Sequence, residues 1–117
     1  MAVSTNELQK ALESLEKALK APKNDLTRDA TIQRFEFCVE LSWKCAKKHM
    51  GTASTAPKQI VREMAQNDMI TDVEIWIESI NQKNLSSHTY NEELAEKVYE
   101  FAKSFAPYIK QLLNKMK

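Results

Sequence analysis

One short polar run holds most of the side chains in this sequence that could do chemistry. His88 lies in it, and histidine is the residue type that exchanges protons near neutral pH. The run falls between two helix-like apolar segments, and loops held by a rigid scaffold are where binding and catalytic residues concentrate. It reads Lys83-Asn84-Leu85-Ser86-Ser87-His88-Thr89-Tyr90. We therefore take it as the first candidate site.

A helix-capping loop is the structural alternative for the same run. Serine, threonine and asparagine side chains commonly satisfy the unpaired backbone groups at helix ends. The composition of the run favours this alternative, because its spacing alone requires no catalytic role. The run becomes a site only if another part of the sequence agrees with it.

A polar stripe along one predicted helix is the second candidate. Its members fall within roughly 80° of arc at about 100° per residue, and they include Asp29, Gln33, Glu36 and Glu40. Carboxylates at this spacing could share a proton or hold a cation. Lys44 and Lys47 continue the stripe, and lysines at helix spacing pair with glutamates such as Glu40. A solvated face is therefore the simpler interpretation, and the stripe matters for function only if it faces His88.

The positions of the two cysteines and of His49 indicate structural roles. Cys38 and Cys45 lie on one predicted helix with a rise of roughly 10 Å between them, too far for a disulfide, and no histidine stands at ligand spacing. His49 falls in the last turn of that helix, where an imidazole favours the negative end of the helix dipole. The sequence has no glycine-rich phosphate loop and no paired aspartates after Gly-Ser. We expect no metal site, no cofactor and no nucleotide transfer by this chain alone.

Composition and charge narrow the class of protein. A chain of 117 residues with 43% hydrophobic residues can bury one core, so we predict a single helical-bundle domain over residues 1–117. Seventeen basic and sixteen acidic residues give a net charge of +1, so any contact with nucleic acid would have to be local. No long apolar run and no signal-like start are present, which predicts a cytoplasmic protein without a membrane segment.

Helices account for the whole predicted fold, because one glycine and three prolines interrupt the sequence and no stretch alternates with a period of two. The first helix follows the capping pattern of Ser4 with Glu7, with Val3 and Leu8 as a hydrophobic staple, and ends at Pro22. A second helix is predicted from about Thr27 to Met50, with Gly51 as the stop, and a third begins at Pro57. A fourth runs from a Thr71–Glu74 capping box to near Asn81. The last begins between Thr89 and Asn91 and runs to the end, with a kink at Pro107.

The predicted helix over residues 27–50 is apolar around most of its circumference. Outside the polar stripe its positions are largely aliphatic, aromatic or cysteine. Such a helix needs more than one neighbour to cover it. It is either the central helix of the bundle or one that also lends part of its surface to a homodimer interface.

A family resemblance joins the two candidate regions. It rests on Arg28-Asp29-Ala30-Thr31-Ile32-Gln33-Arg34-Phe35-Glu36-Phe37, on Glu40-Leu41-Ser42-Trp43-Lys44, on Trp76, and on Asn84-Leu85-Ser86-Ser87-His88-Thr89-Tyr90. Together and in this order these motifs closely resemble the nucleotidyltransferase substrate-binding protein family, a branch of the HEPN superfamily. The resemblance implies an all-α, four-to-five-helix up-and-down bundle that forms homodimers and associates with a separate minimal nucleotidyltransferase.

The resemblance also implies roles for individual residues. In relatives, the HEPN protein is a toxin, a metal-independent ribonuclease with the motif arginine, four to six residues, histidine, one residue, tyrosine, and the partner disarms it by adding AMP to the tyrosine. His88 would then be the catalytic histidine and Tyr90 the acceptor of AMP. Asn84, Ser87 and the stripe from Asp29 to Glu40 would support them.

Lys83 stands where the family motif has arginine. Lysine keeps the positive charge but loses the planar, two-pronged hydrogen bonding of guanidinium, so stabilisation of a phosphorane should fall. We therefore expect first a binding or regulatory subunit modified at Tyr90. The alternatives are a ribonuclease that uses His88 with Lys83 on RNA, and a helical adaptor that only dimerises.

Overall fold

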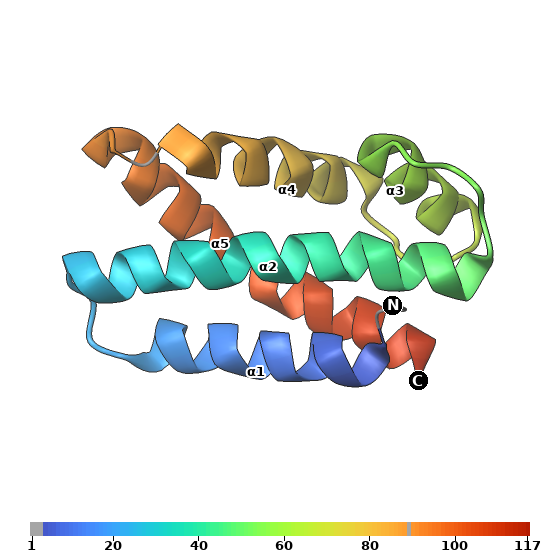
Figure 1. The fold of residues 1–117 in the computed structure, drawn as a ribbon, viewed down its shortest axis with the longest axis horizontal. Coiled ribbons are helices and arrows are strands. Elements are labelled where there is room, and N and C mark those ends of the chain that lie inside the picture. Colours follow the sequence, from blue (N-terminus) through green and yellow to red (C-terminus); the bar gives the residue numbers. More distant parts are fainter. Residues whose placement is uncertain (1–3, 89) are drawn as a thin grey trace.

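The computed structural model describes residues 4–88 and 90–117, and Figure 1 shows the arrangement of the helices in this part. They are α1 (Thr5–Lys20), α2 (Asp25–Met50), α3 (Pro57–Gln66), α4 (Val73–Leu85), a single 3-10 turn η1 (Ser86–His88) and α5 (Glu92–Met116). α1 and α2 run in opposite directions, α4 runs back along α2, and α5 crosses behind α2 from its start towards its end. The predicted all-α up-and-down bundle is confirmed, with five α-helices in the described residues.

Most helix ends follow the predicted capping chemistry. The Ser4 hydroxyl accepts a hydrogen bond from the Glu7 N–H at 3.2 Å, whereas Val3 of the predicted staple lies outside the described residues. Gly51 ends α2 with a left-handed φ of 70°, and its N–H donates to the Lys47 carbonyl. α3 begins at Pro57, and α5 continues through Pro107 to Met116.

Three predicted boundaries were wrong. α2 begins two residues early, because the N-cap is Asn24, which exchanges hydrogen bonds with Thr27. α4 is capped by Asp72, not by Thr71, since the Asp72 carboxylate accepts from the Ile75 N–H at 3.2 Å. α4 also continues past Asn81 to Leu85, because no glycine or proline stands there to end it.

α2 is the central helix, as its apolar circumference predicts. It packs against all four other α-helices and against η1. Its Phe35 is fully buried and meets Phe105 of α5 edge to face, with 6.3 Å between ring centroids. Trp76 of α4 meets the same Phe105 ring at 4.7 Å. These aromatic contacts fix α4 and α5 on α2 and so set where the junction between them lies.

No helix in the part of the chain that the structure describes is both long enough and apolar enough to cross a bilayer.

Candidate functional site

The polar run forms the junction between α4 and α5. Lys83, Asn84 and Leu85 belong to the last turn of α4, and the 3-10 turn ends at His88. The Asn91 N–H donates to the His88 carbonyl at 3.1 Å, and the Asn91 side chain caps α5 by accepting from the Leu94 N–H. Thr89 lies outside the described residues. Tyr90 therefore sits on a short turn that is held by a backbone hydrogen bond and leads directly into a capped helix.

The two serines of the run act as helix caps. The Ser86 hydroxyl donates to the Lys83 carbonyl and is buried, and the Ser87 hydroxyl donates to the Asn84 carbonyl at 3.1 Å. These bonds satisfy carbonyl groups that the end of α4 leaves open. The capping interpretation thus holds for the serines, and it leaves the side chains of His88 and Tyr90 available.

His88 and Tyr90 project into solvent side by side. Their ring centroids lie 6.1 Å apart at an interplanar angle of 79°, and Tyr90 is 86% exposed. Among the described residues neither side chain forms a hydrogen bond to another side chain. The Tyr90 hydroxyl is therefore open to a reacting group brought by another molecule, and any group attached to it would lie close to the imidazole.

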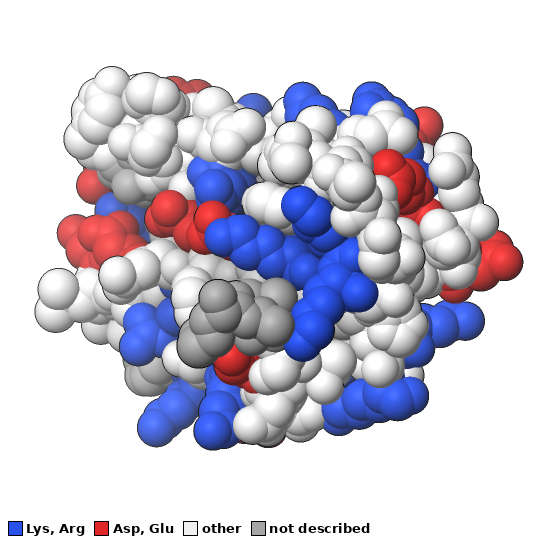
Figure 2. Space-filling view, turned by 45° about the vertical axis from the view of Figure 1, so that its right-hand side comes forward, with Lys and Arg blue, Asp and Glu red and all other residues white. Residues whose placement is uncertain are grey.

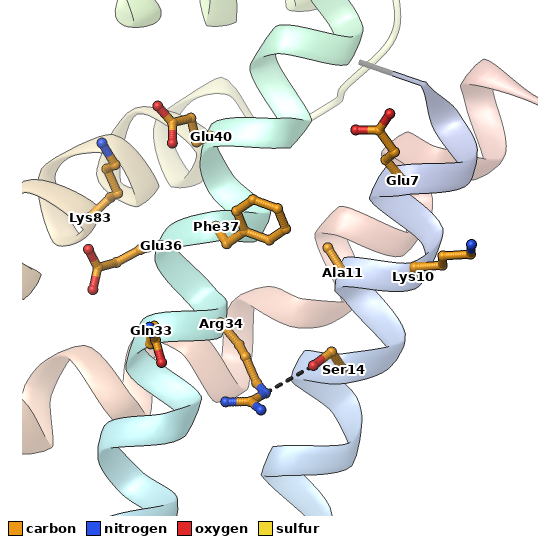
Figure 3. Close-up of a pocket in the computed structure, with 10 residues that line it drawn as sticks. All are labelled: Glu7, Lys10, Ala11, Ser14, Gln33, Arg34, Glu36, Phe37, Glu40 and Lys83. Atoms are coloured by element: carbon orange, nitrogen blue, oxygen red, sulfur yellow. Dashed lines mark hydrogen bonds between the residues drawn. The ribbon is translucent and has the colours of Figure 1, made fainter. Parts of the chain in front are cut away.

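Lys83 lines a surface hollow of about 720 Å³. Figure 3 shows the hollow spread over the outer face of α2, with Lys83 reaching in from α4 and residues of α1 on the other side. Gln33, Glu36 and Glu40 of the predicted stripe line it, as does Phe37, which is 56% exposed. The stripe therefore faces Lys83, and His88 does not line the hollow. Glu40 also accepts from Lys44 at 3.2 Å, the pairing expected of a solvated helix face.

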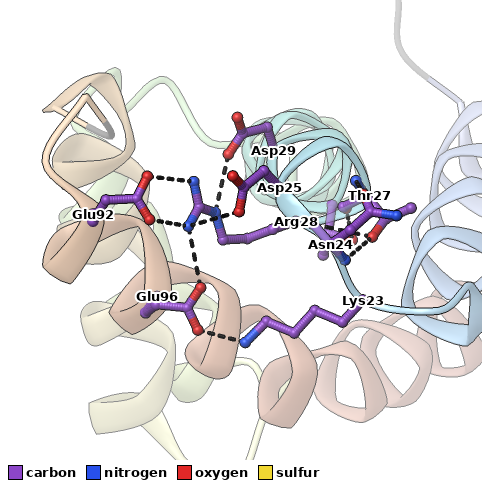
Figure 4. A network of polar contacts seen from close by, with 9 residues as sticks. Lys23, Asn24, Asp25, Thr27, Arg28, Asp29, Glu92 and Glu96 are labelled. Atoms are coloured by element: carbon purple, nitrogen blue, oxygen red, sulfur yellow. Dashed lines mark hydrogen bonds and ion pairs between the residues drawn. The ribbon is translucent and has the colours of Figure 1, made fainter.

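Asp29, the first residue of the predicted stripe, belongs to a different arrangement. It accepts from the buried guanidinium of Arg28 at 3.1 Å, as Figure 4 shows. The Arg28 Nη1 donates to Glu92 at 2.7 Å and to Glu96 at 3.2 Å, and Nη2 donates to Glu92 at 3.3 Å. Lys23 binds the other oxygen of Glu96. The first turn of α2 is in this way tied to the first two turns of α5, directly after Tyr90.

This ionic cluster keeps its charges. Hydrogen bonding to Arg28 lowers the pKa of the Glu92 carboxyl, and bonds to Lys23 and Arg28 lower the pKa of Glu96. The hydrogen bond to Glu92 is also the main reason that the pKa of Arg28 is raised. Both glutamates are therefore ionised at neutral pH and hold the guanidinium in place.

Arg28 was not predicted as a site residue, although it stands in one of the family motifs. A signal was present, because Thr31, Ile32 and Phe35 follow it at spacings of three, four and seven and are all buried. An arginine on the buried face of a helix needs carboxylate partners. The acidic first turn of α5 could have been proposed as their source.

The cysteines do not add a site. Burial raises the pKa of the Cys38 thiol to about 12 and also raises the pKa of Cys45, so both are held as thiols. In the described ranges 4–88 and 90–117, no three His, Cys, Asp or Glu side chains are grouped as metal ligands would be.

Comparison with known families assigns the chain. A family whose members are described as nucleotidyltransferase substrate binding protein like matches residues 4–117. The chain belongs to this family. The resemblance seen in the two motifs is therefore confirmed, and membership of the nucleotidyltransferase substrate-binding protein family implies pairing with a nucleotidyltransferase.

Solved structures share the fold of this chain. A protein from Thermus thermophilus is 27% identical with a TM-score of 0.87 over 94% of this chain and 98% of that one. HI0074 from Haemophilus influenzae, described as having the fold of a substrate-binding domain of a nucleotidyltransferase, is 28% identical with a TM-score of 0.84 over 97% and 98%.

A curated relative adds a name. A protein of Haemophilus influenzae called "Probable ribonuclease HepT" is 34% identical over 76 residues, which cover 58% of this chain and 52% of the relative. The match thus spans about half the length of that protein.

Proposed function

We propose that this chain is the regulatory or substrate-binding subunit that pairs with a separate minimal nucleotidyltransferase, and that the partner adds AMP to Tyr90. The pair would act as toxin and antitoxin, with this chain as the HEPN half. The observation that carries the proposal is the placement of Tyr90, which is 86% exposed and lies directly before the capped start of α5. Few rearrangements are then needed for a second protein to reach the hydroxyl.

The reaction is a transfer at the α-phosphorus of ATP. The Tyr90 oxygen attacks that phosphorus, the bond to the bridging oxygen breaks, and pyrophosphate leaves while the phenolic proton passes to a base. The magnesium ligands that such a transfer needs would come from the partner. The product is a phosphodiester of tyrosine, and its negative charge would lie beside His88, since the two rings are 6.1 Å apart. Charge and bulk would both keep an RNA phosphate out.

Mass spectrometry with the partner enzyme tests this directly. The purified chain is incubated with a minimal nucleotidyltransferase from the same organism, ATP and Mg²⁺. We expect one added AMP, located on Tyr90 and absent from Tyr90→Phe. Tyr108→Phe is the matched control, because it removes a half-buried tyrosine hydroxyl elsewhere and should leave modification intact. The proposal would be overturned if the wild-type chain formed no complex with the enzyme and acquired no AMP.

A second candidate function is a metal-independent ribonuclease that uses His88 with Lys83. It is favoured by the exposed imidazole and by the name of the relative, Probable ribonuclease HepT. His88 would take the proton of an RNA 2′-hydroxyl or donate one to the leaving oxygen. The ammonium of Lys83 would stabilise the negative charge of the phosphorane that forms at the RNA phosphate. Incubation with RNA in EDTA tests it, since equal cleavage by wild type and His88→Ala would exclude this candidate.

A further inference from the structure

The basic residues of this chain are unevenly distributed. Nine of the seventeen Lys and Arg residues lie in residues 41–62 and 101–117, and none of the sixteen Asp and Glu residues does. The rest of the sequence is therefore strongly acidic, although the whole chain is nearly neutral. A net charge of +1 hides this separation, which becomes important only if the fold brings the two basic stretches together.

The fold does bring their ends together. α2 and α5 start beside each other, where Arg28 binds Glu92, and both run towards the same end of the bundle. α3 follows α2 at that end, and Lys115 of α5 lines a hollow with Met69 and Ile70, which come just after α3. We call this region the basic end and define it by the cations of these helix portions: Lys44, Lys47, Lys48, Lys58, Arg62, Lys110, Lys115 and Lys117.

Most cations of the basic end are exposed. Figure 2, which brings this end of the molecule forward, shows Lys and Arg side chains gathered in a band across the middle of the face, with acidic side chains at its flanks. Lys47 and Lys58 are half-buried and the other six are exposed. Lys44 pairs with Glu40, and the described residues show no ion pair for the others. Lys58 lies close enough to Glu78 to help lower the pKa of that carboxyl, and Glu63 and Asp68 lie in and just after α3, so the charge that a partner would meet is mainly that of the other exposed cations.

Helix stability does not account for the pattern. Lysines in the last turn of a helix favour the negative end of its dipole, and Lys47 and Lys48 fit that role. The effect fades within one turn, however, and Lys44 lies further back. Lys58 lies in the first turn of α3, where a cation opposes the dipole. Lys44 is accounted for by its pair with Glu40, but neither effect accounts for Lys58.

We propose that the basic end binds the phosphate backbone of RNA. Protein–nucleic acid interfaces are polar and strongly positive, whereas protein–protein interfaces are built around apolar and aromatic side chains. The large exposed apolar side chains of the described residues are Leu26, Phe37 and Tyr90, and none lies in the basic end. Leu26 begins α2 and Tyr90 precedes α5, both at the opposite end of the bundle. The observations thus favour RNA over an acidic protein.

The basic end would supply affinity, and the residues that react lie elsewhere. His88 precedes α5, so a bound strand would have to extend along the bundle to reach it. The inference rests on the proposed function only in taking RNA as the ligand class. It holds whether or not Tyr90 is modified and whether or not bound RNA is cut.

Binding measured by fluorescence anisotropy tests the inference. The probe is a labelled single-stranded RNA, and His88→Ala is used throughout so that cleavage cannot interfere. Lys47→Gln/Lys48→Gln is compared with Lys17→Gln/Lys20→Gln, which removes the same charge from the last turn of α1. We expect the first pair to weaken binding about tenfold. The plot of log K against log salt should also become less steep by about 1.4, at about 0.7 for each single-strand contact that is lost. The control should change binding less than about twofold.

Three results would overturn the inference: no binding by the His88→Ala protein, equal weakening by both lysine pairs, or displacement of RNA by polyglutamate at equal charge concentration. The last would indicate an acidic protein partner. If the first variant does not fold, Lys110→Gln/Lys115→Gln tests the same surface from α5. If the wild-type chain binds RNA but is not modified by AMP, only the first proposed function is contradicted. If it binds RNA but does not cut it, only the ribonuclease candidate is contradicted.

Discussion

The guanidinium of Arg28 is bound to the carboxylate of Glu92 by two hydrogen bonds, 2.7 Å from Nη1 and 3.3 Å from Nη2. The arginine side chain is 5% exposed, while that of Glu92 is 75% exposed. A buried cation near the start of α2 is therefore satisfied by the first residue of α5, two positions after Tyr90. The contact joins the motif that begins at Arg28 to the helix that directly follows the motif ending at Tyr90.

Replacing Arg28 by methionine should loosen the start of α5. The variant keeps most of the side-chain volume but loses the charge-assisted bonds to three carboxylates, so the free energy of unfolding should fall by on the order of 2 kcal/mol. Amide hydrogen exchange in the first turn of α5 should rise more than exchange in α3. Urea unfolding and exchange monitored by mass spectrometry measure the two effects.

Arg34→Met is the matched control for that experiment. Arg34 also lies on α2, but it bonds Ser14 of α1 and the Ala30 carbonyl and makes no hydrogen bond to α5. The Arg34→Met variant should lower the free energy of unfolding without selectively raising amide hydrogen exchange in the first turn of α5. If both variants raise exchange in the first turn of α5 equally, Arg28 has no special part in holding the turn.

Acid should weaken the same contact. The pKa values of Glu92 and Glu96 are lower in the folded protein than in the unfolded chain, because Arg28 and Lys23 bind the ionised forms. Their stabilisation is therefore fully present above the unfolded value of about 4.3 and is lost as the pH falls through the folded values. The urea midpoint should drop between neutral pH and about pH 3, and it should drop less in Glu92→Gln. An equal drop in both proteins would contradict this account.

Much of the fold was predictable from local rules. Ser4, Gly51 and Pro57 mark helix ends through interactions within a few residues, and the structure places them as expected. The end of α4 was missed, because nothing local separates Asn81 from Leu85. There the helix is extended by long-range packing, which buries Gln82 at 3% exposure and Ser86 at 4%. That residues 1–117 form one domain stays a prediction.

The candidate site was predictable only as a set of residues. His88 and Tyr90 were found through a motif, and their proximity follows from two positions on one turn. The residues that line the hollow with Lys83 could not be foreseen, since they depend on how α4 packs across α2. For the same reason Asp29 was grouped with Glu36 and Glu40, whereas its carboxylate binds Arg28 and the other two line the hollow.

The surface hollow over α2 predicts where two copies of the chain would meet. Phe37 is half exposed at its centre, and charged residues of both signs surround it. If this face forms the homodimer, Phe37→Asp should convert the dimer to a monomer in light scattering after size-exclusion chromatography, because it replaces the apolar contact by a charge that must lose its water in the interface. Leu26→Asp makes the same chemical change at an 83% exposed position outside the hollow. It should leave the mass unchanged, and monomers from Leu26→Asp alone would place the interface elsewhere.

Restoring arginine at position 83 should raise any ribonuclease activity. Lys83 presents a single ammonium, whereas the guanidinium of arginine donates two parallel hydrogen bonds to a phosphorane. In enzymes that stabilise an oxyanion, the loss of one hydrogen-bond donor slows the reaction by roughly a hundredfold. Lys83→Arg should therefore cleave RNA roughly tenfold to a hundredfold faster than wild type in EDTA. Lys97→Arg makes the same change on the exposed side of α5 and should have no effect. Because the gain must act through the histidine, it should vanish in Lys83→Arg/His88→Ala, and a gain that survives there would show that His88 is not the catalytic group.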